Sequence, residues 1–278
     1  MQEKRGQVAL YVLIAVVVVA TLVIFLRPKK LTISGEQAKQ LLSSKAALLK
    51  ATMQDCAVKA ASFCVYKLGK QAGYYRIDTL PYWYWNGPKV IVMYKDLKMN
   101  RINLLPSLDQ ITETEFDLCM QQEGNRILHL CWDPIKERES AEISIHESEP
   151  KLGLIAREKD LLVSIDWQLD LSKQALRGTE HKTIKASNES LDIPLRCIYD
   201  WVNELVNAEI NQLYSVTELS NFLRNKPYSA WCIDTIDSQQ ISEAGRDITI
   251  YLVKATKPAK NPFEFYFAID RTAYEFKT

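Results

Sequence analysis

The sequence predicts an α+β fold that follows an amino-terminal transmembrane helix. Residues 8–26 form a run of 19 uncharged, mostly apolar positions, and no comparable run follows. Downstream, apolar residues recur at helical spacing over 38–72 and 193–211, whereas apolar and polar residues alternate over 161–171 and 263–270. Helical and period-2 patterns in separate segments are typical of helices packed on antiparallel strands. We therefore expect a transmembrane helix continuing to a long helix, and then antiparallel strands with packed helices.

The apolar segment has the length of a single membrane span. As a helix, its residues would extend about 28 Å, close to the ~30 Å hydrocarbon core of a bilayer. Cations flank it on both sides, namely Lys4 and Arg5, then Arg27, Lys29 and Lys30. The positive-inside rule therefore gives little preference for either orientation of the span. A short cationic flank before an apolar segment nevertheless resembles an uncleaved export signal. We expect a single-pass protein of the cell membrane with an extracytoplasmic domain.

A second interpretation comes from the four residues that precede the apolar segment. Lys4-Arg5-Gly6-Gln7 resembles the class III signal of type IV pilins, in which a basic pair and a glycine precede the cleavage site. Processing would then separate Gly6 from Gln7. Bacterial pilins carry Glu at the fifth mature position, where this chain has Tyr11, so the match is partial. It implies a pilin-like subunit that assembles through its amino-terminal helix.

The composition is that of an ordered globular chain. Thirty-five Lys and Arg nearly balance 34 Asp and Glu in 278 residues, and glycine occurs only nine times. The near-neutral charge gives no indication of a nucleic-acid partner or of a polybasic membrane patch. The length is sufficient for a hydrophobic core without structural metals.

The first helix after the apolar segment is expected from residue 34 to about residue 72. Ser34 and Gln37 form a capping-box pair, and Gly73 is a suitable residue to end the helix. Cys56 and Cys64 both fall on this helix. Eight residues of helix separate them by about 12 Å, which is too far for a disulfide between them, so each needs a partner elsewhere.

The cysteine pattern favours disulfide bonds. The chain has six cysteines outside the apolar segment and no Cys-x-x-Cys pair. An even count fits an oxidising compartment, and the alternative is buried, reduced thiols. If helices pack together, Cys119 is a natural partner for Cys56 or Cys64, and Cys131 could take the other. The connectivity stays open, and the candidates are Cys56, Cys64, Cys119, Cys131, Cys197 and Cys232.

An aromatic hairpin is expected between residues 82 and 94. Residues 82–85 are Tyr82, Trp83, Tyr84 and Trp85, and a β-branched run over 89–94 follows the turn signal Asn86-Gly87. Three interpretations of the aromatic run stay open. It is an ordinary strand with one buried face, a surface that binds a sugar or a partner, or a contact with the membrane interface.

A second helix is expected from residues 106 to 122, capped by Ser107 and Gln110, with a break at Glu123-Gly124. His129, Cys131 and Asp133 then alternate, so in a strand they would face one side. This pattern favours a half-buried strand that ends before Pro134, with a corner of a metal or thiol site as the alternative. A hydrolase that uses Cys131 and His129 is the corresponding enzymatic hypothesis.

An antiparallel meander is expected in the middle of the chain, with strands over 141–145, 161–171 and 181–186 and a turn over 151–160. Asn188-Glu189-Ser190 is a glycosylation sequon on an expected loop, which makes Asn188 a candidate glycosylation site.

The carboxyl-terminal region is expected to add the amphipathic helix 193–211, a short helix over 216–224, and strands over 247–254 and 263–270. The last strand is expected to be interior because aromatic residues alternate along it. We divide the chain into three parts: a tail and anchor over 1–30, a helix–hairpin–helix subdomain over 31–135, and an α+β subdomain over 136–278.

Several segments, in this order, resemble uncharacterised single-span membrane proteins of small-genome archaea. They are Lys4–Gln7 with the apolar helix, 54–56 followed by 68–75, the strand 163–171, residues 193–200 leading into a helix, and 263–268. The resemblance covers most of the chain and implies an anchored α+β domain that faces the outside. It implies no catalytic or binding residue. Ala72-Gly73 replaces an expected Gly-Gly, which bears on the local backbone conformation.

No catalytic motif is present in the sequence. Gly-x-Gly-x-x-Gly, a P-loop and Gly-x-Ser-x-Gly are all missing. Asp166 and Asp170 lie about 13 Å apart along one strand, too far for glycosidase chemistry. We therefore expect no enzyme, no cofactor, no metal and no nucleic-acid partner. The expected partners are membrane lipid through residues 8–26 and a protein or envelope component. The alternative function is that of the pilin-like subunit.

Overall fold

The computed structural model describes residue 16 and residues 33–78, 80, 82–84, 89–97, 100–210, 232–242, 247–255 and 262–270. The predicted membrane segment lies outside these ranges except for Val16, as do Gly6, Gln7, Trp85 and the expected helix 216–224. None of the helices within the described ranges combines the length and the apolar character that a bilayer crossing requires.

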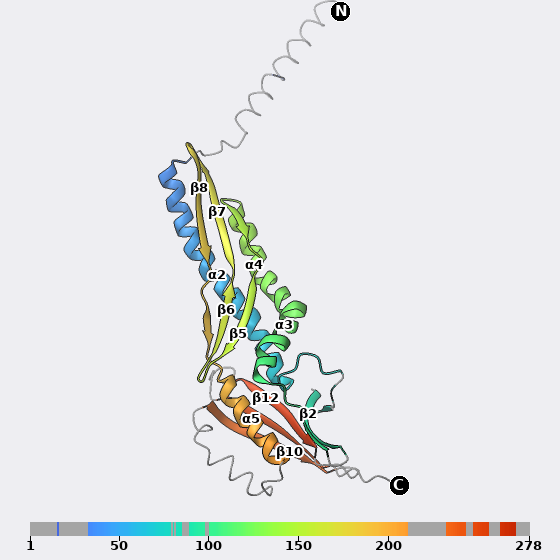
Figure 1. Ribbon diagram of the computed structural model, residues 1–278. Coiled ribbons are helices and arrows are strands. Elements are labelled where there is room, and N and C mark those ends of the chain that lie inside the picture. The colour runs from blue at the N-terminus through green and yellow to red at the C-terminus, as the bar shows by residue number, and fades with distance from the viewer. Residues whose placement is uncertain are drawn as a thin grey trace, which may run out of the picture.

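The described chain forms an elongated body, and helix α2 (Gly35–Lys70) runs along much of its length (Figure 1). Its 36 residues correspond to a rod of about 54 Å. The helix begins at the end of the body that we call proximal. Its last turn contacts Phe263 and Glu264 of a sheet at the opposite end, which we call distal.

Helix α2 has a well-defined amino terminus. Ser34 is extended, with φ −68° and ψ 159°. Its hydroxyl accepts the Gln37 N–H at 3.2 Å, and the Gln37 side chain accepts the Ser34 N–H at 3.0 Å. The predicted capping box is therefore confirmed. The extended Ser34 also corrects one expectation, because α2 begins at Gly35 and is not continued by helix at Ser34.

The carboxyl end of α2 is closed by two residues with positive φ. The Gly73 N–H donates to the Leu68 carbonyl at 2.8 Å, and the Ala72 N–H donates to Gly69 at 3.3 Å. Ala72 has φ 55° and Gly73 has φ 90°. These are the bonds of a Schellman motif, in which Ala72 takes the left-handed position that glycine usually fills. The helix ends close to the predicted place, but Gln71 and not Gly73 is its C-cap.

A second helical segment runs antiparallel to α2. It comprises η1 (Gln110–Glu115), α3 (Phe116–Cys119), η2 (Met120–Gly124) and α4 (Asn125–Ser140). Turns η1 and η2 are π-helical. The Gln110 N–H donates to the Ser107 hydroxyl at 3.1 Å, which confirms Ser107 as the predicted cap. The Gln110 side chain does not take part in this cap and donates to Glu115 at 3.3 Å.

Two expectations for this segment are wrong. Glu123-Gly124 does not break the helix, because the glycine fits beside Met120 and Cys64, where a side chain would be crowded. Residues 129–133 are helical rather than extended, and α4 continues past Pro134.

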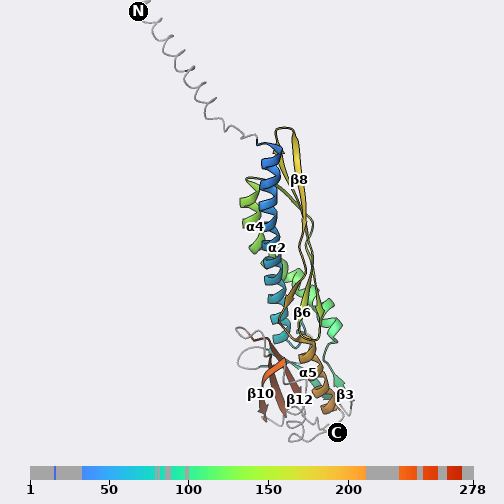
Figure 2. The ribbon, with the colours of Figure 1, turned by 90° about the vertical axis from the view of Figure 1, so that its left-hand side faces the viewer.

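Two three-stranded antiparallel sheets line the long helices. One has the order β4-β7-β8 and the other β5-β6-β9. Their strands are β4 (Ser144–Glu147), β5 (Lys151–Ala156), β6 (Leu161–Asp166), β7 (Gln168–Ala175), β8 (Gly178–Lys185) and β9 (Glu189–Leu191). Helix α2 contacts strands of both sheets and lies beside α4 (Figure 2).

The period-2 pattern over 161–171 places the odd-numbered residues in the core, as predicted. The single expected strand is nevertheless two strands, because the chain passes from one sheet to the other at Trp167, whose ring packs on Trp132 of α4 with centroids 5.1 Å apart. Residues 151–156 also form β5 rather than a turn.

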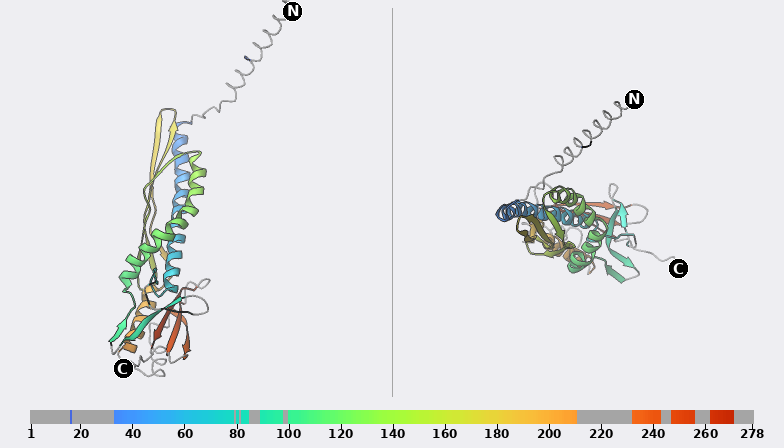
Figure 3. Two further views of the ribbon diagram at one scale, coloured as in Figure 1. Left: turned by 90° about the vertical axis from the view of Figure 1, so that its right-hand side faces the viewer. Right: turned by 90° about the horizontal axis from the view of Figure 1, so that it is seen from above.

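A third sheet occupies the distal end and contains six strands (Figure 3). Its order is β1-β2-β12-β11-β10, and β3 also pairs with β2. The strands are β1 (Tyr82–Tyr84), β2 (Lys89–Leu97), β3 (Asn100–Asn103), β10 (Ile233–Ile241), β11 (Ile248–Ala255) and β12 (Glu264–Asp270), and helix α5 (Leu195–Ile210) packs against β2 and β3. We call this unit the distal sheet.

The distal sheet confirms the interior position of β12, which lies between β11 and β2. It corrects the expectation of purely antiparallel pairing, because β12 pairs with β2 in parallel. Strands β3, β9 and β10 were not predicted, since their residues show no clear alternation.

The predicted division of the chain into two subdomains at residue 135 does not match the sheets. Strands β1–β3 come from residues 82–103 and join strands from residues 233–270 in one sheet. Likewise, α2 belongs to the first expected subdomain but packs against β7 and β8 of the second. Both expected subdomains therefore contribute to each end of the molecule.

Candidate interaction surface

All six cysteines form disulfides, as the sequence favoured. Cys56 of α2 bonds Cys131 of α4, and Cys64 of α2 bonds Cys119 of α3. The third bond joins Cys197 of α5 to Cys232 next to β10. The structure therefore resolves the connectivity that the sequence left open, with two bonds holding α2 to the antiparallel helix and one holding α5 to the distal sheet.

The combination of His129, Cys131 and Asp133 does not form a thiol site. In a helix, His129 and Asp133 share one face, and His129 Nδ1 lies 3.3 Å from Asp133 Oδ1. Cys131 is bonded to Cys56, so it offers no thiolate to a substrate or a metal. Within the described ranges, no three His, Cys, Asp or Glu side chains are grouped as a metal site would require.

A polar cluster surrounds Tyr75, where the chain leaves α2. The Tyr75 hydroxyl donates to Glu123 at 2.9 Å, Lys67 pairs with the same carboxylate, and the Lys67 ammonium lies 4.7 Å from the centre of the Tyr75 ring. Buried Glu115 accepts the Tyr75 backbone N–H at 2.9 Å. The Lys67 hydrogen bond lowers the pKa of Glu123, and burial raises the pKa of Tyr75. Each of these groups has a partner within the cluster, so the cluster fixes the end of α2 against the antiparallel helix.

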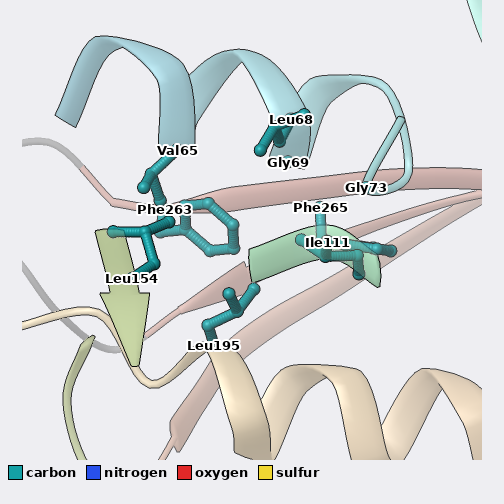
Figure 4. A pocket seen from close by; sticks show the side chains of 9 residues that line it. All are labelled: Val65, Leu68, Gly69, Gly73, Ile111, Leu154, Leu195, Phe263 and Phe265. Atoms are coloured by element: carbon teal, nitrogen blue, oxygen red, sulfur yellow. The ribbon is translucent and has the colours of Figure 1, made fainter. Parts of the chain in front are cut away.

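A small apolar cavity lies where α2 meets the distal sheet (Figure 4). Its volume is about 10 Å³, at the lower limit for one water molecule. Its lining residues are Val65, Leu68, Gly69, Gly73, Ile111, Leu154, Leu195, Phe263 and Phe265. A cavity of this size is a small gap in the packing between the end of α2 and the distal sheet, with room for one water molecule at most.

The two edges of the distal sheet differ in character. Strand β10 is a nine-residue edge with mostly exposed polar side chains, and Asp237 pairs with Lys254 at 3.3 Å. Charged edges of this kind resist pairing with other chains. Strand β1, on the other side, carries the aromatic run, and Tyr82 is 37% exposed. Because aromatic residues are enriched at protein interfaces, β1 is the better candidate contact surface.

The structure describes part of the predicted aromatic surface. Tyr82, Trp83 and Tyr84 form β1, which pairs antiparallel with β2 as expected for the hairpin, and Trp85 lies outside the described ranges. Sequence reasoning missed that this strand is the edge of a sheet shared with residues 233–270, because no local signal encodes such pairing.

The sequon residue Asn188 is exposed and precedes β9 directly. Its side-chain carbonyl accepts the Ile165 N–H at 2.9 Å. This hydrogen bond fixes the orientation of the Asn188 side chain against β6. Whether Asn188 carries a glycan stays a prediction.

Comparisons with protein-family models, with curated proteins and with solved structures found no match to this chain.

Proposed function

We propose that this chain is a single-pass membrane protein whose non-catalytic body stands outside the cytoplasm and uses its distal sheet to bind a protein or an envelope component. The pairing of all six cysteines is the observation that carries this proposal. Disulfides persist in oxidising compartments and are rare in the cytosol. The uncharged segment 8–26 supplies the anchor, since its length matches a bilayer core.

The direction of α2 supports a role for the distal sheet. The chain enters the body at Ile33, two residues before α2, and α2 carries it about 52 Å to the contact between Gly69 and β12. We infer that α2 points away from the membrane, so that an anchor at residues 8–26 leaves the distal sheet far from the lipid. This position favours a partner-binding role for Tyr82, Trp83, Tyr84 and Trp85 over a contact with the membrane interface.

The alternative is a pilin-like subunit that is processed between Gly6 and Gln7. The capped start of α2 at Ser34 argues against it, because the amino-terminal helix and α2 would not form one continuous rod. Mass spectrometry of the native amino terminus separates the two functions. A start at Met1 or Gln2 excludes peptidase processing, whereas a start at Gln7 would favour the pilin-like subunit.

The compartment is tested on the full-length protein in intact cells. A membrane-impermeant amine reagent is expected to modify exposed lysines of the body, such as Lys59, whose side chain is 58% exposed. A cytosolic protein in the same cells is the control and should react only after lysis. Modification of the body only after lysis would overturn the extracytoplasmic assignment. Recovery of the protein in a detergent-free supernatant after ultracentrifugation would overturn the anchor.

The binding role is tested by photocrosslinking. A photoreactive phenylalanine analogue at position 82 is expected to give a discrete adduct in intact cells. The matched control carries the analogue at position 130, because Leu130 is more exposed than Tyr82, at 70% against 37%, and belongs to α4 rather than to the distal sheet. Adducts of the same pattern and yield from both positions, or none from position 82, would argue against the distal sheet as the binding surface.

A further inference from the structure

The hairpin of β7 and β8 ends at the proximal tip of the body (Figure 1). Ala175 pairs with Gly178, so Leu176 and Arg177 form a two-residue turn. Gly178, the residue directly after the turn, has a positive φ of 141°. The Leu176 side chain is 65% exposed and Arg177 is exposed.

A leucine at the tip of a hairpin is unusual in water. Turns favour Gly, Asn, Asp, Ser and Pro, whose backbones or short polar side chains suit the conformation, and Leu has none of these advantages. Nothing in the turn geometry requires Leu176, because its φ is not positive and other residues adopt such a conformation equally well. Its side chain therefore suits a contact outside the body.

The same turn lies beside the point where the chain enters the body. The Leu176 N–H donates to the Ile33 carbonyl at 3.1 Å. Only residues 27–32 separate Ile33 from the end of the uncharged segment at Leu26. Seven residue steps span at most about 25 Å when fully extended. The turn is thus tethered within that distance of the end of the apolar segment.

We propose that the β7–β8 turn contacts the lipid surface, with Leu176 in the interfacial region of the bilayer and Arg177 at the headgroups. This inference rests on the anchoring of residues 8–26 proposed above. An apolar side chain next to a cation matches the layered polarity of the interface, where apolar groups reach inward and long cationic side chains extend back to the headgroups. The turn and the anchor then hold the rod at two points, which restricts its tilt.

The test uses the full-length protein with Leu176→Cys. Because all six native cysteines are in disulfides, the new thiol is the only free one, and a thiol count of one per chain verifies that the native bonds are intact. The thiol is labelled with an environment-sensitive fluorophore. The protein is then reconstituted into vesicles of phosphatidylcholine and phosphatidylglycerol that contain a nitroxide lipid as a shallow quencher.

The matched control is Ile155→Cys, labelled in the same way. Ile155 is 52% exposed, and its neighbour Leu154 lines the cavity at the far end of α2, so this position is distant from the turn. We expect quenching at position 176 to exceed that at position 155 by at least about threefold. Equal quenching at both positions in protein that floats with the vesicles would overturn the lipid contact alone. Failure of the protein to float would overturn the anchoring, and the lipid contact with it.

Discussion

At the residue scale, Gly69 shows how a single atom sets the contact between α2 and the distal sheet. A Cβ at this position would lie 2.5 Å from the backbone oxygen of Glu264 and 2.7 Å from the Phe263 ring. Both distances are well below van der Waals contact. The helix can approach β12 this closely only because residue 69 has no side chain.

We therefore expect Gly69→Ala to destabilise the protein by about 1–3 kcal/mol, the usual cost of overpacking a core. The sign of this stability change is informative, because alanine would stabilise an unobstructed helix by about 1 kcal/mol relative to glycine. Urea unfolding measures the change. The control is Gly153→Ala, where the new Cβ would lie 3.9 Å from the nearest atom, and an equal loss in the control would refute the steric explanation.

Glu139 is a second residue with a defined physical role. Its carboxylate accepts a 2.5 Å hydrogen bond from Lys45 and is 4% exposed. The Lys45 hydrogen bond lowers the pKa of Glu139 below its ordinary 4.5, with a smaller contribution from Arg138. The hydrogen bonds that Lys45 donates to Glu139 and Glu142 raise the pKa of Lys45 above 10.5. The pair ties the start of α2 to the end of α4.

The pair stabilises the fold over a predictable pH range. A lowered pKa in the folded state adds stability that is fully present above pH ~4.5 and is lost as the pH falls through the folded value. The raised pKa of Lys45 adds stability that is fully present below pH ~10.5 and is lost as the pH rises through its folded value. The contribution is therefore complete near neutrality.

Glu139→Gln is expected to cost about 1–2 kcal/mol at pH 7, in the range of a charge-assisted hydrogen bond. The difference from the native protein should be smaller at pH 3 than at pH 7, because the stabilisation is lost as the pH falls through the lowered pKa of folded Glu139. Urea unfolding at the two pH values measures it. Glu142→Gln is the matched control, because Glu142 also contacts Lys45 but is 56% exposed, and its effect should be smaller. A pH-independent cost would contradict the ionic explanation.

At the element scale, two disulfides determine how α2 packs against α3 and α4. Their sequence separations are 75 and 55 residues. Loop-closure entropy varies slowly with length, so the two bonds should stabilise the fold to within about 0.3 kcal/mol of each other.

Replacing Cys56 and Cys131 together by Ala is expected to lower the free energy of unfolding by about 2–4 kcal/mol. The same should hold for Cys64 and Cys119. Equilibrium unfolding of both double variants makes the comparison. A supporting measurement counts free thiols in denatured, unreduced native protein, for which none is expected. Six reactive thiols would refute the disulfides, and an unchanged unfolding midpoint would refute their role in stability.

At the scale of the whole molecule, the distal sheet joins segments that are far apart in the chain. Strand β2 pairs with β12, and the Cys197–Cys232 bond holds α5 to the same unit. The central strand β12 would lose its β2 neighbour if the chain were cut at residue 135, and β7 and β8 would lose α2.

We therefore expect residues 136–278 alone not to fold cooperatively, because they lack both β2 and α2. Residues 33–278 should unfold in a single urea transition, and they serve as the control. Near-ultraviolet circular dichroism and the sharpness of the transition measure the difference. A cooperative transition for residues 136–278 would restore the division at residue 135 as a true domain boundary.

Local patterns predicted much of the secondary structure. The capping box of Ser34 and Gln37, the alternation over 161–171 and the amphipathic helix 193–211 were all evident in the sequence, because hydrogen bonds and side-chain periodicity act over a few residues. The errors at Gly124 and Trp167 have a different origin. Packing against α2 keeps Gly124 helical, and a change of sheet divides the strand at Trp167.

The sequence by itself determined the apolar amino-terminal segment, the long first helix, the alternating strands and the even set of cysteines. Only the tertiary structure decided which cysteines pair, which strands are edges, and that Leu176 lies beside Ile33. These outcomes depend on contacts between residues far apart in the chain. Such contacts are selected by the packing of whole elements, and no short stretch of sequence carries that information.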